Sequence, residues 1–209
     1  MEIIKENLGS KLSWLCDIFI LNIVYVVTCI PLITIGAANT ALYTVVFRMV
    51  KGERYEVLVD YKRAFRENFK QGTVIWLFVA VVSGVLIVDF LIAPGFSRQL
   101  ATIFVMIILV LGIICMMTGV YVFPLLATFS NGTMTMLKNA LLISVRHLPK
   151  TIVVILIHSI PYLLLFISVS AFIRGYGVVM LFLAGIIAYG ECSILLPIFK
   201  KYFPKVERN

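Results

Sequence analysis

The fold of this chain is decided by residues 100–126, LATIFVMIILVLGIICMMTGVYVFPLL, which contain no Asp, Glu, Lys or Arg. A helix rises ~1.5 Å per residue, so about 20 apolar residues cross the ~30 Å hydrocarbon core of a bilayer. This stretch is long enough for one membrane-spanning helix. A transmembrane β-strand would instead alternate apolar and polar residues over about 10 positions, and this stretch shows no such alternation.

Further stretches of the same character lie on both sides of it. They are residues 18–47, 73–93, 151–173 and 175–199, and each carries at most one charged residue. The first is too long for one span and too short for two, and Pro31 and Gly36 interrupt it. We therefore predict a span that ends at about residue 35, then a bend, then an amphipathic helix over about 38–50 near the membrane interface.

The predicted fold is all-α: a polytopic helical membrane protein with about five transmembrane helices and additional interfacial amphipathic helices. Hydrophobic residues make up 62% of the 209 positions, against roughly 45–50% in soluble domains. This composition excludes an ordinary soluble protein, a disordered protein and a secreted disulfide scaffold. We expect a single membrane domain over 1–209, with spans at about 14–35, 73–93, 100–126, 151–173 and 176–199, and with cytoplasmic connections at about 36–72 and 127–150.

The distribution of Lys and Arg predicts the orientation. With five spans, 14 of the 18 Lys and Arg fall in the two long connections and the C-terminal tail. The positive-inside rule then places the C-terminus in the cytoplasm and the N-terminus outside. One alternative stays open, in which residues 1–13 lie flat on the cytoplasmic face and the number of spans differs from five by one. Topology and attraction to anionic lipid headgroups account for the net charge of +8, so we expect no nucleic-acid partner.

The predicted bend combines helix-breaking and polar residues. Asn39 or Thr40 could cap the following helix by accepting its first backbone N–H bonds. An exposed helix N-terminus attracts anions, so a small anion or substrate site is the functional interpretation. We favour a structural one, in which Thr34 and its polar neighbours satisfy backbone groups left unpaired by Pro31 and Gly36.

A second motif precedes the span at 73–93. Arg66 and Lys70 lie one helical turn apart, and Phe65 and Phe69 form a parallel pair one position earlier, with Asn68 between them. The pattern is typical of an interfacial anchor, with aromatic rings at the acyl boundary and cations at the lipid phosphates. The same surface could dock a cytoplasmic partner, but lipid anchoring is the simpler interpretation.

Charged side chains inside hydrocarbon are expensive and usually have a purpose. At helical rise, Glu191 and His158 lie ~12 Å and ~11 Å from the cytoplasmic boundary on consecutive antiparallel spans. We therefore predict a Glu191–His158 hydrogen bond or ion pair, which Thr28, at a similar depth, could join. Its function would be proton coupling or substrate binding. The alternative is interhelical stabilisation of ~1 kcal/mol per hydrogen bond.

Enzymatic interpretations lack support. The sequence has no Gly-rich phosphate loop, no Gly-x-Ser-x-Gly and no His-Glu-x-x-His. The two histidines, His147 and His158, have no carboxylates placed for a zinc site. Asp89 and Glu191 lie at opposite depths, which argues against a catalytic pair. We expect no enzymatic activity, no cofactor and no bound metal.

Residues 31–43, PLITIGAANTALY, resemble the elbow motif of the YesL-like family of bacterial integral membrane proteins. Residues 65–71, FRENFKQ, resemble the second motif of that family, and segments 123–127 (as a second elbow) and 138–140 also fit. The resemblance extends over nearly the whole chain. The family has no established biochemical activity, so no catalytic residues carry over. Its members tend to be encoded beside carbohydrate uptake transporters and polysaccharide-degrading enzymes.

The resemblance therefore implies a multi-pass protein of the bacterial plasma membrane, acting as an accessory or regulatory component of carbohydrate (oligosaccharide) uptake. Its partners would be the bilayer and the permease subunits of a transporter. The alternative is a small transporter or channel that uses His158 and Glu191, and that forms homo-oligomers because five spans are few. A polar cavity from Glu191 to the cytoplasm would favour transport, whereas an apolar lateral groove would favour a partner.

Overall fold

The computed structural model describes the backbone of residues 2–167 and 177–202, and the side chains of 13–160, 163 and 183–202. The described part of the chain is helical and contains no strand, which confirms the all-α class. In order, the elements are α1 (Glu2–Cys29), η1 (Leu32–Thr34), α2 (Ile35–Lys51), α3 (Val57–Glu67), α4 (Phe69–Ile92), η2 (Ala93–Gly95), α5 (Arg98–Thr128), α6 (Thr133–Arg146), α7 (Leu148–Ile167) and α9 (Gly177–Tyr202).

Several helical segments are long and apolar enough to cross a bilayer. Within the described residues there are four: Leu32–Lys51, Phe69–Gly95, Arg98–Thr128 and Leu183–Tyr202. The pair α6 and α7, bent by 108°, makes a fifth if both belong to one span. These numbers confirm a helical membrane protein with about five apolar helices. The end of the predicted span 151–173 and the start of the span 176–199 lie outside the described residues.

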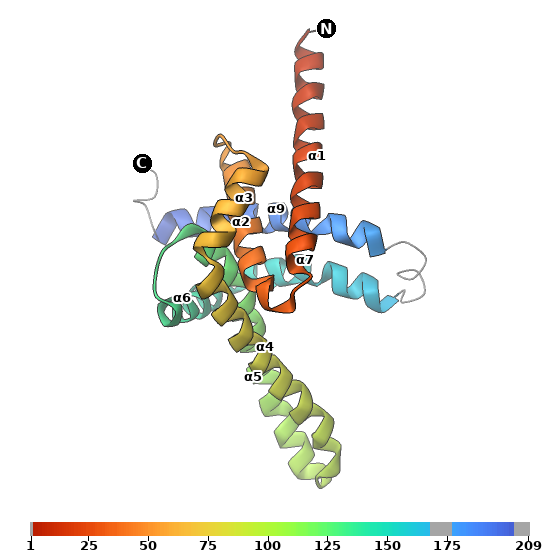
Figure 1. The fold of residues 1–209 in the computed structure, drawn as a ribbon. Coiled ribbons are helices and arrows are strands. Elements are labelled where there is room, and N and C mark those ends of the chain that lie inside the picture. Colours follow the sequence, from red (N-terminus) through yellow and green to blue (C-terminus); the bar gives the residue numbers. More distant parts are fainter. Residues whose placement is uncertain (1, 168–176, 203–209) are drawn as a thin grey trace.

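The hairpin of α4 and α5 is the most exposed part of this arrangement. The two helices run side by side away from the other elements and are joined by η2 (Figure 1). Only 6% and 11% of their most apolar windows are buried. Large exposed apolar surfaces indicate contact with lipid or with another protein. The hairpin therefore presents a large apolar outer surface, as expected of a membrane protein.

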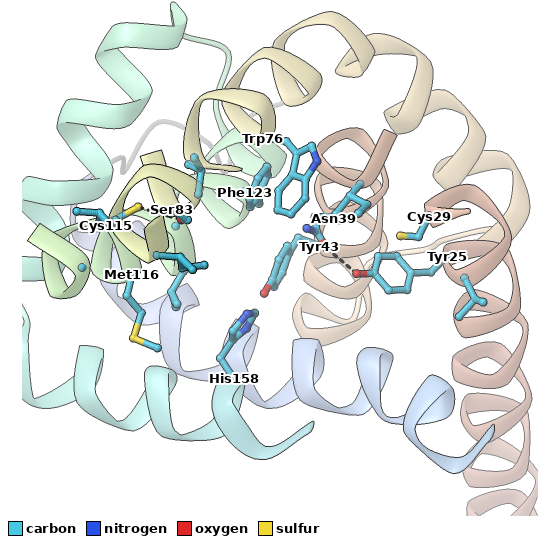
Figure 2. A pocket seen from close by; sticks show the side chains of 18 of the residues that line it. Tyr25, Cys29, Asn39, Tyr43, Trp76, Ser83, Cys115, Met116, Phe123 and His158 are labelled. Atoms are coloured by element: carbon cyan, nitrogen blue, oxygen red, sulfur yellow. Dashed lines mark hydrogen bonds between the residues drawn. The ribbon is translucent and has the colours of Figure 1, made fainter. Parts of the chain in front are cut away.

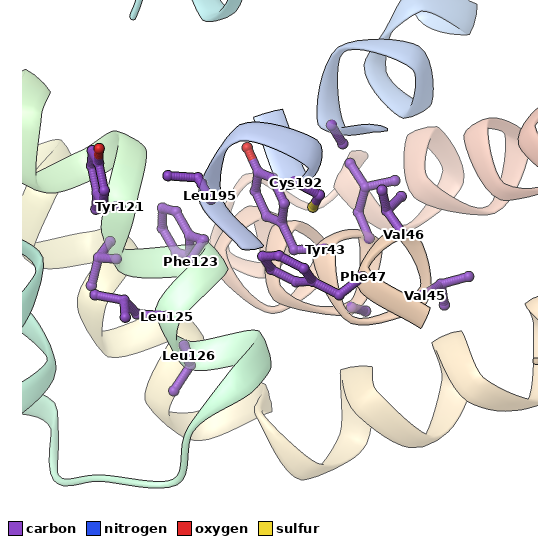
Figure 3. Close-up of a cluster of buried hydrophobic side chains, with 14 of the residues drawn as sticks. Tyr43, Val45, Val46, Phe47, Tyr121, Phe123, Leu125, Leu126, Cys192 and Leu195 are labelled. Carbon is purple, nitrogen blue, oxygen red and sulfur yellow. The ribbon is translucent and has the colours of Figure 1, made fainter. Parts of the chain in front are cut away.

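Helix α2 shows the opposite behaviour. The segment 38–50, which we expected at the interface, belongs to the most enclosed of the candidate spans, and 67% of its apolar window is buried. α1, α3, α4, α5 and α9 all pack against it, and its Tyr43 and Phe47 belong to the main core (Figure 3). The polar residues that made it look amphipathic bond to their own helix: Thr40 Oγ1 donates to Gly36 O and Thr44 Oγ1 to Thr40 O. Hydroxyls satisfied in this way can be buried.

The elbow between α1 and α2 is held by one threonine. Thr34 Oγ1 donates to the carbonyl oxygens of Thr28 (2.5 Å) and Pro31 (2.6 Å). These bonds agree with the structural interpretation of the motif. Because α2 begins at residue 35, Asn39 and Thr40 lie inside the helix, so the prediction that either of them caps it is wrong.

Gly36 is required by a close approach of two helices. A Cβ atom at Gly36 would lie 2.0 Å from the carbonyl oxygen of Gly72 and 2.7 Å from Cβ of Trp76. The first turn of α2 and the first turn of α4 thus touch backbone to backbone, which only glycine permits.

The expected second elbow at 123–127 does not form, because the helix continues through these residues. Residues 123–127 continue α5, which contains Pro124 and ends at Thr128. The chain turns instead over residues 129–132, before α6. This proline alone therefore does not mark a helix boundary.

Candidate functional site

A network of three side chains lies at the centre of the bundle. Nδ1 of His158, on α7, lies 3.0 Å from Oε1 of Glu191, on α9. The hydroxyl of Tyr43, on α2, donates to Oε2 of the same carboxylate. The predicted contact between Glu191 and His158 is confirmed. We call Tyr43, His158 and Glu191 the triad; Tyr43 and Glu191 are buried, whereas the side chain of His158 is 39% exposed.

Burial explains why all three groups are needed. Glu191 is 0% exposed, and a buried carboxylate is tolerated only when its oxygens are paired. Here each of the two oxygens has a partner, one from α7 and one from α2. The triad therefore joins α2 to two helices near the C-terminus, α7 and α9.

Tyr43 is the residue that sequence reasoning missed. It ends the 31–43 motif but was assigned to a peripheral helix. Gly36, Thr40 and Tyr43 follow the i, i+4, i+7 spacing of one helix face, and all three are buried. That spacing was the available signal for a buried face.

Thr28 does not join the triad. Its hydroxyl donates to the carbonyl oxygens of Val24 and Tyr25 and lies 2.5 Å from the hydroxyl of Tyr61 on α3. The prediction of a shared site with His158 is therefore wrong. Thr28 instead connects α1 to α3. The prediction failed because a similar depth in the membrane does not fix the direction in which a side chain points.

A cavity of about 820 Å³ adjoins the triad. Side chains from α1, α2, α4, α5 and α7 line it, and Tyr43 and His158 belong to its wall, whereas Glu191 does not (Figure 2). Besides Tyr43 and His158, two polar pairs interrupt a largely apolar lining. The Tyr25 hydroxyl donates to Oδ1 of Asn39 at 2.8 Å, and Ser83 lies 3.7 Å from the sulfur of Cys115.

The cavity opens to the surface between the elbow end of α1, α4 and α5, and we call it the lateral cavity. Its lining includes Ile30, Ile87 and Met116, which are 73%, 60% and 49% exposed. These three apolar residues belong to the elbow end of α1, to α4 and to α5. The mouth of the cavity is therefore bordered by exposed apolar side chains, and the polar end of the cavity lies next to the triad.

Residues of the predicted interfacial anchor lie at the junction of α3 and α4. Asn68 separates the two helices, and its Nδ2 donates to Ala64 O at 3.0 Å. The Phe65 and Phe69 rings are 5.6 Å apart. Arg66 and Lys70 are exposed. An exposed pair of cations fits lipid anchoring, which stays a prediction.

A second buried carboxylate pins α3 to α2. Asp60 is 6% exposed, and its Oδ1 lies 2.9 Å from Arg48 and also bonds to Arg63. The backbone N–H of Glu56 donates to its other oxygen at 3.0 Å. These partners satisfy the carboxylate within the protein.

The connection between α2 and α3 also contacts α1. The Tyr55 hydroxyl donates to Oδ2 of Asp17 at 2.8 Å. Burial is the larger cause and this bond to a carboxylate the smaller one, and together they raise the pKa of Tyr55 to about 12. The hydroxyl therefore keeps its proton at physiological pH. Among the residues described, no group of three or more His, Cys, Asp and Glu could hold a metal ion.

The fold and this site define a polytopic helical membrane protein with a lateral, largely apolar cavity that ends at the triad. Residues 18–90 match the family model described as "Protein of unknown function, DUF624". The match contains the 31–43 and 65–71 motifs and helices α2 and α3, whereas segments 123–127 and 138–140 lie outside it. No curated protein and no solved structure matches the chain.

Proposed function

We propose that this chain is an accessory or regulatory component of a bacterial carbohydrate uptake system in the plasma membrane, and that it belongs to the YesL-like proteins. Both motifs that carry the resemblance to that family lie within the matched residues 18–90. The observation that carries the proposal is the cavity, which is lateral and largely apolar while Glu191 has no exposed surface.

The chemistry of the cavity is unsuited to carrying a sugar. An oligosaccharide has many hydroxyl groups, and moving a hydroxyl from water into apolar surroundings without a hydrogen bond costs at least ~1–3 kcal/mol. The wall offers few polar side chains to compensate that cost. Sugar passage is therefore assigned to permease subunits, and this chain would act on them.

The α4–α5 hairpin offers a surface for such subunits. Ala80 and Gly84 lie one turn apart on α4, and no atom lies within 4 Å of the position that a Gly84 Cβ would occupy. Small residues at this spacing let a second helix approach closely. We assign this face of α4 to the permease contact.

The test is affinity purification of the tagged protein in mild detergent, with identification of the copurified proteins. The expected result is stoichiometric recovery of permease subunits of a carbohydrate transporter, reduced at least fivefold by Gly84→Leu. Gly190→Leu, on α9, is the matched control, because a Cβ there also meets open space. Recovery of the chain alone, or only as a homo-oligomer, would contradict the proposal.

For the orientation, we place the C-terminus and the two basic connections in the cytoplasm. The Tyr55–Asp17 bond brings the start of the apolar part of α1 next to the connection between α2 and α3. This contact supports the alternative topology, in which the N-terminal residues lie on the cytoplasmic side, over an N-terminus outside the cell.

Cys16 tests this choice because it is exposed and adjoins Asp17. In a variant with the other three cysteines replaced by Ala, a membrane-impermeant thiol reagent added to intact cells should leave Cys16 unlabelled. The same reagent should label it after the cells are opened. Labelling in intact cells would restore the N-terminus-outside topology.

The triad supports a second candidate function, a small oligomeric transporter or channel. Tyr43 and His158 border the cavity and contact a buried carboxylate, which suits coupled proton movement. If Glu191→Gln and His158→Gln each abolish uptake while the permease contact persists, this second function is favoured. Uptake that survives both changes excludes it.

A further inference from the structure

We propose that the lateral cavity binds a single-chain amphiphile drawn from the bilayer. Its hydrocarbon chain would lie along the wall that α4 and α5 form together, and its uncharged, hydroxyl-bearing head would lie at Tyr43 and His158. This inference concerns a ligand of the isolated chain and does not depend on the accessory function.

The shape of the cavity suits one chain. Its lining runs along α4 from Trp76 to Ile87 and along α5 from Gly112 to Phe123. Each strip covers eleven residue steps, or ~16 Å of helix. Because α4 and α5 pack side by side, the two strips form one elongated wall.

The volume of the cavity is that of a small-molecule site. It measures about 820 Å³. Small-molecule sites usually measure about 300–1,000 Å³. The cavity therefore has the size of a lipid-like molecule.

Two glycines on α5 keep the wall open. Gly112 and Gly119 are seven residues apart, so they lie on the same face of the helix. No atom lies within 4 Å of the position that a Cβ would take at either residue. A larger side chain at these positions would extend into the cavity without meeting the backbone of another helix.

The mouth selects for entry from hydrocarbon. Ile30, Ile87 and Met116 are exposed apolar residues of the lining. A ligand that enters past them must have an apolar surface, because a polar one would lose its hydration there.

The inner end selects an uncharged head. Tyr43 and Asn39 lie one turn apart on α2, and the Tyr43 oxygen can accept a hydrogen bond while it donates to Glu191. Glu191 lies directly behind this wall, and no Lys or Arg belongs to the described lining. Carboxylate and phosphate heads prefer Arg or Lys partners, so a hydroxyl fits better than an anion.

The protein carries its own probe of occupancy. Trp76 lines the cavity, and the chain has two tryptophans. In a Trp14→Phe variant in lipid nanodiscs, titration with a brominated long-chain monoacylglycerol should quench Trp76 fluorescence saturably. Gly119→Leu should raise the half-saturating mole fraction at least tenfold, whereas Gly84→Leu, outside the cavity, should leave it unchanged.

Further measurements complete the test. A brominated fatty acid of the same length should bind at least fivefold more weakly at neutral pH. If Gly119→Leu fails to fold, judged by circular dichroism and size exclusion, Gly112→Leu replaces it. Quenching that rises linearly with mole fraction and does not respond to the filled cavity would overturn the proposal, since it reports contact with bulk lipid. These outcomes leave the copurification result for permease subunits unaffected.

Discussion

Two buried carboxylates show how the same group serves different ends in this protein. Asp60 is held by the guanidinium groups of Arg48 and Arg63 and by a backbone N–H. Glu191 is more deeply buried, at 0% against 6% exposed, yet its two oxygens contact a phenol and an imidazole.

The two carboxylates differ in how their negative charge is compensated and in whether their partners line the cavity. Two permanent cations neutralise Asp60 near the surface, where the arginine side chains are 34% and 51% exposed. Within the triad, only His158 can supply a positive charge to Glu191, and both partners of Glu191 border the cavity. We infer that Asp60 is a structural pin, which holds α2 and α3 together, and that Glu191 is coupled through Tyr43 and His158 to the contents of the cavity.

The largest effect is expected at the pin. Asp60→Asn removes the charge that pairs with both arginines and should lower the free energy of unfolding by about 2 kcal/mol, less than for fully buried pairs because the arginines are solvated. Thermal unfolding in detergent measures it. Arg63→Gln, at the more exposed arginine, should cost under about 1 kcal/mol, and equal losses would contradict the role assigned to Asp60.

A smaller effect is expected from Tyr43→Phe, which removes one hydrogen bond of Glu191 and keeps the ring in the core. Polar bonds between membrane helices are worth about 1 kcal/mol, and the unpaired oxygen of the buried carboxylate adds a desolvation cost. The stability measured by denaturant unfolding should therefore fall by about 1–2 kcal/mol. Tyr25→Phe, which removes the bond to Asn39, is the matched control at the cavity wall. A loss clearly larger than that of Asp60→Asn would make the triad a second pin.

Glu191→Gln should change stability still less, by under about 1 kcal/mol. The amide keeps the shape, and it can accept from Tyr43 and donate to His158. A destabilisation of several kcal/mol would show that the carboxylate itself holds the fold. Stability within the expected range, combined with altered monoacylglycerol binding, would sharpen the contrast with Asp60.

The smallest effect comes from His147, which lies outside the triad and whose Nε2 is 2.9 Å from the Tyr202 hydroxyl. Burial and the positive charges of Lys150, Lys201 and Arg146 lower its pKa. The folded state thus binds this proton more weakly than the unfolded chain, so the associated stability is present above pH 6.5 and is lost as pH falls through the lowered pKa.

Comparison with His147→Gln isolates this contribution. The melting temperature of the wild type should fall slightly more between pH 7.5 and 5.5 than that of the variant. The remaining pH dependence can then be assigned to other groups, the triad among them. A wild type that gains stability on acidification relative to the variant would contradict the direction of the shift.

The sequence predicted the features that depend on hydropathy and axial position. Charge-free stretches predicted the all-α membrane class, and matched depths on consecutive helices predicted the contact between His158 and Glu191. Depth alone failed for Thr28, because rotation about the helix axis points it at Tyr61. Tyr43 was missed because segment 38–50 was predicted as an amphipathic helix at the membrane interface. The Thr40 and Thr44 hydroxyls bond to their own helix, which allows the segment to be buried.

Two other features were beyond local patterns. Arg63 is three residues from Asp60 and could have been paired with it, but Arg48 reaches Asp60 only because α2 and α3 pack together. Gly36 was interpreted as a helix breaker, whereas its partner Gly72 lies 36 positions further along the chain. Contacts of this kind follow from tertiary packing and leave no periodic signal.

The backbone contact at Gly36 has a mechanical consequence for the cavity. Trp76 follows Gly72 by one helical turn, and its indole N–H donates to the carbonyl oxygen of Leu32 at 2.8 Å. The elbow and the first turns of α4 are thus joined at two points, and Ile30 at the mouth belongs to the same unit. When another part of the chain bends, the elbow and the first turns of α4 move together as one rigid unit. The width of the cavity mouth is therefore set by the distance between α5 and this unit.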